Sequence, residues 1–198
     1  MIIGLDHLSL NCKDNISFKK KIIYYQKIFG FRSINHKEKD LFINKTTRNH
    51  YISFHTILAN LPPIEKTFYG KSKFKAQNIK VKKNNVFLSV FSKKKEFAFW
   101  KKVLNLQASK NKINFFSFYD QKKYKFYFDE KYKSKDYLDY IGYTSLCFVS
   151  TDIFKVYKSC KGFNIEISNI FNFKMNKKKI KIFFFRSPGG IIFEIVQY

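Results

Sequence analysis

The chain begins the same local pattern three times, and this repetition constrains its fold more than any other feature. Near residues 2, 84 and 140, a strand-like stretch is followed by a helix-like stretch and then by further strands. At the first and third starts an acid suited to cap the helix, Asp14 or Asp152, follows the strand, and a Gly-Phe pair ends the helix. Repeated units of this size share one core, so a chain built from repeated modules is expected.

The restarts also set the expected boundaries. The expected modules cover residues 1–60, 84–130, as a divergent middle unit, and 138–198. Their expected elements include helices over about 15–29 and 94–106 and strands over about 40–45, 50–58, 112–119 and 123–130. Residues 61–83 contain Pro62-Pro63 and show little periodicity, so we expect a connector or covering loop there.

The end of the chain combines a turn with an acid in an apolar strand. Pro188-Gly189-Gly190 reverses the chain because proline fixes its own φ and glycine permits positive φ. Glu194 then lies in the middle of a strand of β-branched and aromatic residues. A buried, unpaired carboxylate costs several kcal/mol, so Glu194 is expected either to lie on a solvated face, to pair with a lysine or to bind a metal ion.

The opening strand carries polar groups on one face. Its alternation places His7, Ser9 and Asn11 on one side and Leu8 and Leu10 on the other. His7 therefore faces away from the apolar side of the strand.

The two ends together resemble a known family. The segments GLDHLSLNCKD and YYQKIFGFR near the start, and FFRSPGGIIFEIVQ near the end, look like the ends of a vicinal oxygen chelate protein, the glyoxalase, bleomycin-resistance and extradiol-dioxygenase superfamily. The resemblance implies an α+β fold of repeated βαβββ modules, with curved antiparallel sheets around a cavity and helices outside. It also implies that His7 and Glu194 are metal ligands, with Glu194 a catalytic residue, and that the metal is Fe, Mn, Zn or Ni.

The chain departs from the family pattern at the start of its last module. When that strand is aligned with the opening strand, Ser145 takes the position of His7 and Cys147 that of Ser9. Relatives usually have a histidine there, and a neutral serine is a poor ligand. The residues that could supply a third donor are His55, Cys147 and Glu130, and His50 is a further candidate by residue type.

The net charge of +25 does not by itself indicate nucleic-acid binding. Arginine occurs only at positions 32, 48 and 186, so 39 − 3 = 36 of the basic residues are lysines. Lysine, asparagine, isoleucine and aromatics are abundant together, as an AT-rich coding sequence would produce. A nucleic-acid surface would be expected to use arginine for bidentate contacts, so nucleic acid is the disfavoured partner.

Other features favour a cytoplasmic protein. No apolar run of about 18 residues is available to span a membrane, and no signal peptide is apparent. The three cysteines show no metal-binding spacing and leave one unpaired in any disulfide scheme.

Two functions remain open on the sequence alone. The first is a metal-dependent enzyme that acts on a small oxygen-bearing substrate by lyase, isomerase or dioxygenase chemistry. The second is a metal-free protein that binds or sequesters a small molecule, as the bleomycin-resistance branch does, and Ser145 favours it. In either case Ser9, Asn11, Ser145 and Cys147 are expected to line the pocket. A homodimer is left open.

Overall fold

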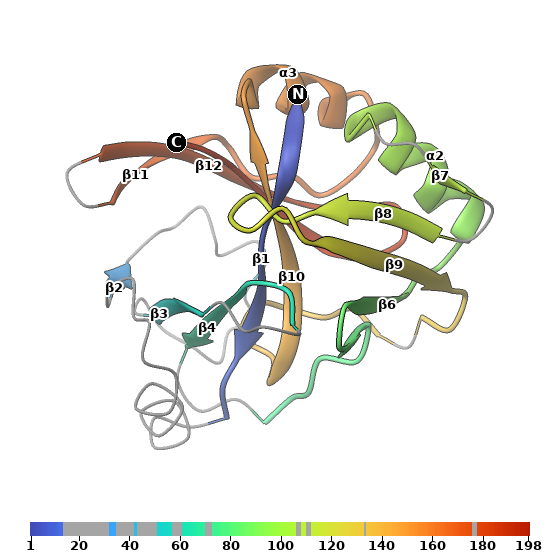
Figure 1. The fold of residues 1–198 in the computed structure, drawn as a ribbon, viewed down its shortest axis with the longest axis horizontal. Helices are drawn as coiled ribbons and strands as arrows, with labels where there is room; N and C mark the ends of the chain where they lie inside the picture. Colours follow the sequence, from blue (N-terminus) through green and yellow to red (C-terminus); the bar gives the residue numbers. More distant parts are fainter. Residues whose placement is uncertain are drawn as a thin grey trace.

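The computed structural model arranges the residues that it describes in two sheets and two helices (Figure 1). The described residues are 1–13, 32–34, 42, 51–56, 61–69, 73–105, 108–109, 112–132, 134–175 and 178–198. Neither helix within these ranges has the length and apolar character required to cross a membrane.

The larger sheet has eight strands and is formed by the two ends of the chain. Its order is β11-β12-β13-β10-β1-β4-β3-β2. The strands from the first part of the chain are β1 (Ile2–Asn11), β2 (Arg32–Ile34), β3 (Tyr51–Thr56) and β4 (Ile64–Phe68). Those from the last part are β10 (Gly142–Ser150), β11 (Phe171–Met175), β12 (Lys178–Arg186) and β13 (Ile192–Gln197).

The smaller sheet has five strands from the middle of the chain. Its order is β5-β6-β9-β8-β7. The strands are β5 (Ile79–Lys82), β6 (Asn85–Ser89), β7 (Ala108–Ser109), β8 (Lys112–Phe116) and β9 (Lys123–Asp129). Helix α2 (Lys93–Val103) follows β6, and helix α3 (Ile153–Lys161) follows β10.

All three parts of the chain use the same strand order. In each set of four, the first strand pairs with the fourth in parallel, as in β1 with β4, β6 with β9 and β10 with β13. The third strand then lies next to the fourth, and the second lies at the edge. The predicted α+β class is therefore confirmed. The sheets differ from the expected antiparallel form because each module closes on a parallel pair, which makes both sheets mixed.

The first and last modules meet along β1 and β10, which run side by side through the centre of the molecule (Figure 1). The two strands pair antiparallel, with Leu8 opposite Leu146. An approximate twofold axis therefore relates the two halves of the large sheet. Rotation about this axis brings His7 to the position of Ser145.

The large sheet separates two cores because successive side chains in strands such as β13 point to opposite faces. In β13, Phe193 and Ile195 pack into a core shared with both helices and the small sheet. Ile192 and Val196 face a second core on the other side, together with Cys147 of β10. Polar site residues therefore lie on the side of this second core, to which the middle module contributes Phe118.

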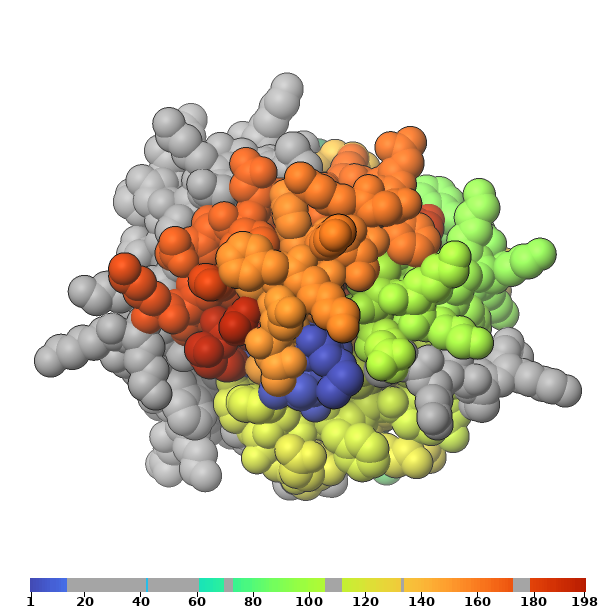
Figure 2. Space-filling view, turned by 90° about the horizontal axis from the view of Figure 1, so that it is seen from above, coloured from blue at the N-terminus to red at the C-terminus, as the bar shows by residue number. Residues whose placement is uncertain are grey.

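The start of β1 is where the three modules come together. Figure 2 shows the first residues of the chain, in blue, between atoms of the last module, in orange, and of the middle module, in yellow. Leu5 forms a bridge with Ser117, and the amide of Phe118 donates to the carbonyl of Leu5 over 2.8 Å. A side chain on Gly4 would lie 3.1 Å from the backbone of Phe118, so this approach requires a small residue.

The expected elements are recovered wherever the structure describes them, with one exception. Helix α2 and strands β3, β8 and β9 lie at the predicted places. Asp152 caps α3 by accepting from the amide of Lys155, and Gly162 ends it. The helix over 15–29 falls outside the described residues, as does the strand over 40–45 apart from Phe42. The range 61–83, expected to be a connector, instead contains β4 and β5.

Candidate metal centre

A β-bulge sets the direction of the first site residues. Leu5 and Leu8 both lie in the core shared with the helices, although residues three apart in a regular strand face opposite sides. The register of β1 against β10 shifts between Leu5 and His7, which leaves Asp6 as the extra residue of a bulge. His7 and Asp6 are consequently adjacent as well as buried, and Asp6 Oδ1 lies 2.8 Å from His7 Nδ1.

Two carboxylates approach the other nitrogen of the same ring. His7 Nε2 lies 3.3 Å from Glu65 Oε2 and 3.7 Å from Glu194 Oε2. One ligand atom from each of these three residues lies within 4.8 Å of the other two. The first strand and the last strand of the chain thus meet at one buried point.

The pairing of the sheet explains why the carboxylates converge. Glu65 lies beside Ser9 in the pairing of β4 with β1, and Glu194 lies beside Cys147 in the pairing of β13 with β10. Ser9 and Cys147 correspond to each other on the approximate twofold axis, so Glu65 and Glu194 correspond as well. Two symmetry-related strands therefore bring their acids to the same side of His7.

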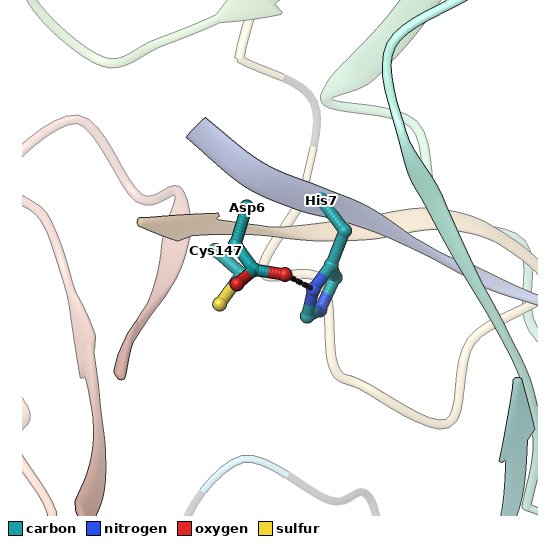
Figure 3. A group of neighbouring side chains, drawn as sticks. All are labelled: Asp6, His7 and Cys147. Carbon is teal, nitrogen blue, oxygen red and sulfur yellow. Dashed lines mark hydrogen bonds and ion pairs between the residues drawn. The ribbon is translucent and has the colours of Figure 1, made fainter. Parts of the chain in front are cut away.

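A second group of donors lies on the Nδ1 side of His7. Asp6, His7 and Cys147 also have ligand atoms within 4.8 Å of one another. Figure 3 shows Asp6 and Cys147 close together, with the hydrogen bond between His7 and the Asp6 carboxylate drawn as a dashed line. Burial raises the pKa of the Cys147 thiol well above its usual value, so it is neutral at physiological pH.

The charge state of His7 follows from its neighbours. Burial opposes a charged ring, but the Glu65 carboxylate and the hydrogen bond to Asp6 raise the pKa of His7 well above its ordinary value. Burial and the nearby carboxylates of Glu65 and Glu194 also raise the pKa of Tyr69, which is therefore a protonated phenol.

The three residues around His7 Nε2 fit a divalent metal ion. Ligands at about 2.0–2.2 Å from a common metal lie about 3–3.6 Å from each other, and the two measured separations are close to that range. One imidazole with two carboxylates is a donor set that suits Fe, Mn, Zn and Ni. Asp6 supplies a third carboxylate at the other ring nitrogen, where a carboxylate commonly orients a ligating histidine.

Two of the predicted pocket residues, Ser9 and Asn11, donate side-chain hydrogen bonds in the structure. Ser9 donates to Glu65 Oε2 over 3.4 Å, and Asn11 donates to the backbone oxygen of Asp139 over 2.8 Å. Ser145 is fully buried opposite Ser9, and its hydroxyl has no hydrogen-bond partner among the described residues.

The residues considered as a third metal ligand differ in what the structure shows of them. His50 and the side chain of His55 lie outside what the structure describes, although the backbone of His55 pairs with Glu65 in the sheet. Glu130 is wrong as a ligand candidate, because it is exposed and accepts a hydrogen bond from the amide of Lys93 at the start of α2. That amide is a helix-end donor without an intrahelical partner, which explains the position of the acid.

Sequence reasoning missed Glu65 and Asp6. A signal for Glu65 was present, because Glu65 and Tyr69 have the same spacing as Glu194 and Tyr198 at the end of the chain. Asp6 carried no such signal, since a regular strand would direct it away from His7 and only the bulge brings it near.

Comparisons with known proteins give structural neighbours only. No family model and no curated protein matches the chain. Glyoxalase I from Zea mays is 13% identical with a TM-score of 0.43, over 99% of this chain and 68% of that one. A putative dioxygenase from Bacillus subtilis is 11% identical with a TM-score of 0.41, over 99% and 63%. An integron cassette protein from V. cholerae is 17% identical with a TM-score of 0.40, over 65% and 97%.

Proposed function

We propose that the chain is a metal-dependent enzyme of the vicinal oxygen chelate type that acts on a small oxygen-bearing substrate. The observation that supports this most directly is the convergence of His7, Glu65 and Glu194, from three different strands, on one buried point. Three protein ligands with open positions are the usual arrangement of a catalytic metal site.

The local charge supports a cation rather than an anionic ligand at this point. The chain has a net charge of +25 and only 14 acidic residues, yet Asp6, Glu65 and Glu194 gather around one imidazole. Buried carboxylates that face each other are costly unless a positive group neutralises them. A divalent cation bound by Glu65, Glu194 and the ring of His7 would provide that compensation.

Each residue of the site would have a distinct role. His7 Nε2, Glu65 and Glu194 would hold the metal, and Asp6 would fix the ring. The metal, when bound, supplies a Lewis acid that polarises adjacent substrate oxygens. Ser145, which corresponds to His7 on the approximate twofold axis, would offer a buried hydroxyl to hydrogen-bond the substrate.

Metal analysis tests this assignment. Protein purified without chelator is expected to contain about one equivalent of a divalent metal, and His7→Ala, Glu65→Gln and Glu194→Gln are each expected to lose most of it, because three protein donors leave no redundancy. Asp129→Asn, which removes a carboxylate paired with exposed Lys131, is the matched control and should keep the metal. Folded wild-type protein that neither contains nor takes up Mn, Co, Ni or Zn would rule the proposal out.

The alternative is a metal-free binding protein, and the replacement of the expected histidine by Ser145 is the observation that favours it. In that case the protein would take up a small molecule without chemistry, as the bleomycin-resistance resemblance implies. A thermal-shift screen separates the two functions. Stabilisation by divalent metals supports the enzyme, whereas stabilisation by aromatic acids with no response to metals supports sequestration.

A further inference from the structure

Asp6 is the point where the three modules connect to the proposed metal ligand. Its side chain is fully buried, and both of its carboxylate oxygens accept hydrogen bonds. Oδ1 accepts from the ring of His7 over 2.8 Å and from the hydroxyl of Tyr119 over 3.1 Å. Oδ2 accepts from the hydroxyl of Tyr198. The orientation of the carboxylate is therefore fixed from two sides.

The two tyrosines come from different modules and support each other. Tyr119 lies in the turn between β8 and β9 of the middle module, and Tyr198 follows β13 of the last module. Their hydroxyl oxygens are 3.2 Å apart, and the ring of Tyr198 stacks on Phe118 with 6.1 Å between centroids. Burial and the Asp6 carboxylate raise the pKa of both phenols, so both remain protonated donors.

The turn that carries Tyr119 is itself fixed. The hydroxyl of Ser117 accepts from the amide of Tyr119 over 3.2 Å and from the amide of Asp120 over 3.4 Å. The same turn docks on β1 through the bridge between Leu5 and Ser117, one residue before Asp6. The position of the phenol is consequently set by the backbone of the middle module.

The last module provides an internal comparison. On the approximate twofold axis, Thr144 corresponds to Asp6 as Ser145 corresponds to His7, and the register of β10 shifts at Thr144 as that of β1 shifts at Asp6. Both hydroxyls of this pair are buried without a hydrogen-bond partner in the described part of the chain. The carboxylate is thus absent from the module in which the imidazole is absent, as expected if its role is to orient that ring.

We propose that Tyr119 of the middle module is a positioning residue, which with Tyr198 holds the Asp6 carboxylate so that the ring of His7 presents Nε2 to Glu65 and Glu194. A carboxylate that accepts from Nδ1–H leaves the lone pair of Nε2 available to a metal. The inference rests on the proposed metal site. Through Tyr119, the middle module tunes the metal affinity of a centre to which it contributes no ligand.

Two measurements on three variants test the proposal. Removal of an orienting partner of a ligating histidine costs roughly 10–100-fold in metal affinity, so Asp6→Asn should lose that much. Tyr119 and Tyr198 contact Asp6 rather than His7, so Tyr119→Phe and Tyr198→Phe should each lower the metal affinity by roughly 3–10-fold. Affinity is measured by calorimetric titration with Co²⁺ and Zn²⁺. The second measurement is the proton resonance of His7 Nδ1–H in the metal-free protein, which should exchange faster with water in all three variants.

Tyr127→Phe is the matched control, because Tyr127 lies on β9 of the same sheet and stacks on Phe87 rather than contacting Asp6. It should leave both measurements unchanged. Unchanged metal affinity and unchanged His7 exchange in Tyr119→Phe would overturn the positioning role. If wild-type protein binds no metal, the proposed function fails by itself, and the exchange of the His7 proton still decides whether Tyr119 positions that ring.

Discussion

At the scale of single residues, protonation and metal binding compete for the ring of His7. Asp6 and Glu65 stabilise its charged form, whereas a metal ion requires its deprotonated Nε2. Since the pKa of His7 is raised well above its usual value, the metal-free ring is protonated at neutral pH. Metal binding must therefore displace a proton.

This competition predicts the pH dependence of metal binding. We expect about one proton to be released per metal at pH 7, and metal affinity to fall about tenfold for each pH unit below the raised pKa of His7. Calorimetry in buffers of different ionisation enthalpy, with Ni²⁺ or Zn²⁺, measures the number of protons. Metal binding without proton release at pH 7 would contradict the prediction.

The residues that sequence reasoning proposed as metal ligands were those that disturb a regular pattern. His7 and Glu194 are isolated polar groups in apolar strands, so their burial posed a visible problem. Glu65 escaped notice because it is followed by Lys66 and Thr67 and looks like part of a polar segment, although both are buried. Tyr119 could not be found at all, because a residue in a turn acquires its partner only when two modules dock.

At the scale of elements, the turn before β13 shows two distinct uses of glycine. Gly190 has φ +94°, which side chains rarely adopt, as expected for a turn. Gly189 is required for space instead, since a Cβ there would clash with the carboxylate of Glu96 and lie 2.9 Å from Val90. Its amide donates to Glu96 Oε2 over 2.6 Å. The pattern predicted the turn but not the partner beneath it.

Substitution of Gly189 by alanine is therefore expected to destabilise the protein. The added methyl group must push Glu96 away and break a buried hydrogen bond, at a cost of about 2–4 kcal/mol in the free energy of unfolding. Gly162→Ala is the control, because Gly162 has φ −69° and its nearest neighbour would be 3.4 Å from the new methyl group. That variant should change stability by less than about 1 kcal/mol. Urea unfolding measures the free energy of unfolding of both variants, and equal values would refute the prediction.

The elements that were mispredicted are the short ones. Strand β4 has five residues and β5 four, and both lie in a lysine-rich stretch after Pro62-Pro63. The burial of β4 does not alternate cleanly, because its consecutive residues Lys66 and Thr67 are both buried. Long periodic elements such as α2 were predicted to within three residues of their observed ends, since 11 residues are enough for the apolar face to repeat.

At the scale of the whole molecule, the middle module is joined to the last one through a buried acid. Glu96 of α2 accepts from the indole of Trp100 over 2.8 Å as well as from the amide of Gly189. Trp100 packs edge-on against Phe193 of β13 in the same core. The buried carboxyl group of Glu96 therefore lies at the packing interface between the two modules, and the groups that hydrogen-bond it are neutral donors.

Burial raises the pKa of Glu96 from 4.5 to about 7, against the lowering effect of its hydrogen bonds to Trp100, Ser187 and Gly189. Because the folded state holds this proton more tightly than the unfolded state, the contribution to stability is complete below about pH 4.5. It decreases as the pH rises from there to about 7. A shift of this size corresponds to about 3 kcal/mol across that window.

The predicted measurement is the free energy of unfolding of wild-type protein and Glu96→Gln between pH 4.5 and 8. Glutamine is neutral throughout, so the difference between the two proteins should change by up to about 3 kcal/mol over that range, with the wild type losing stability relative to the variant as the pH rises. The raised pKa of His7 affects both proteins equally and cancels in this difference. A difference that is constant with pH would mean that Glu96 does not titrate at the junction between the modules.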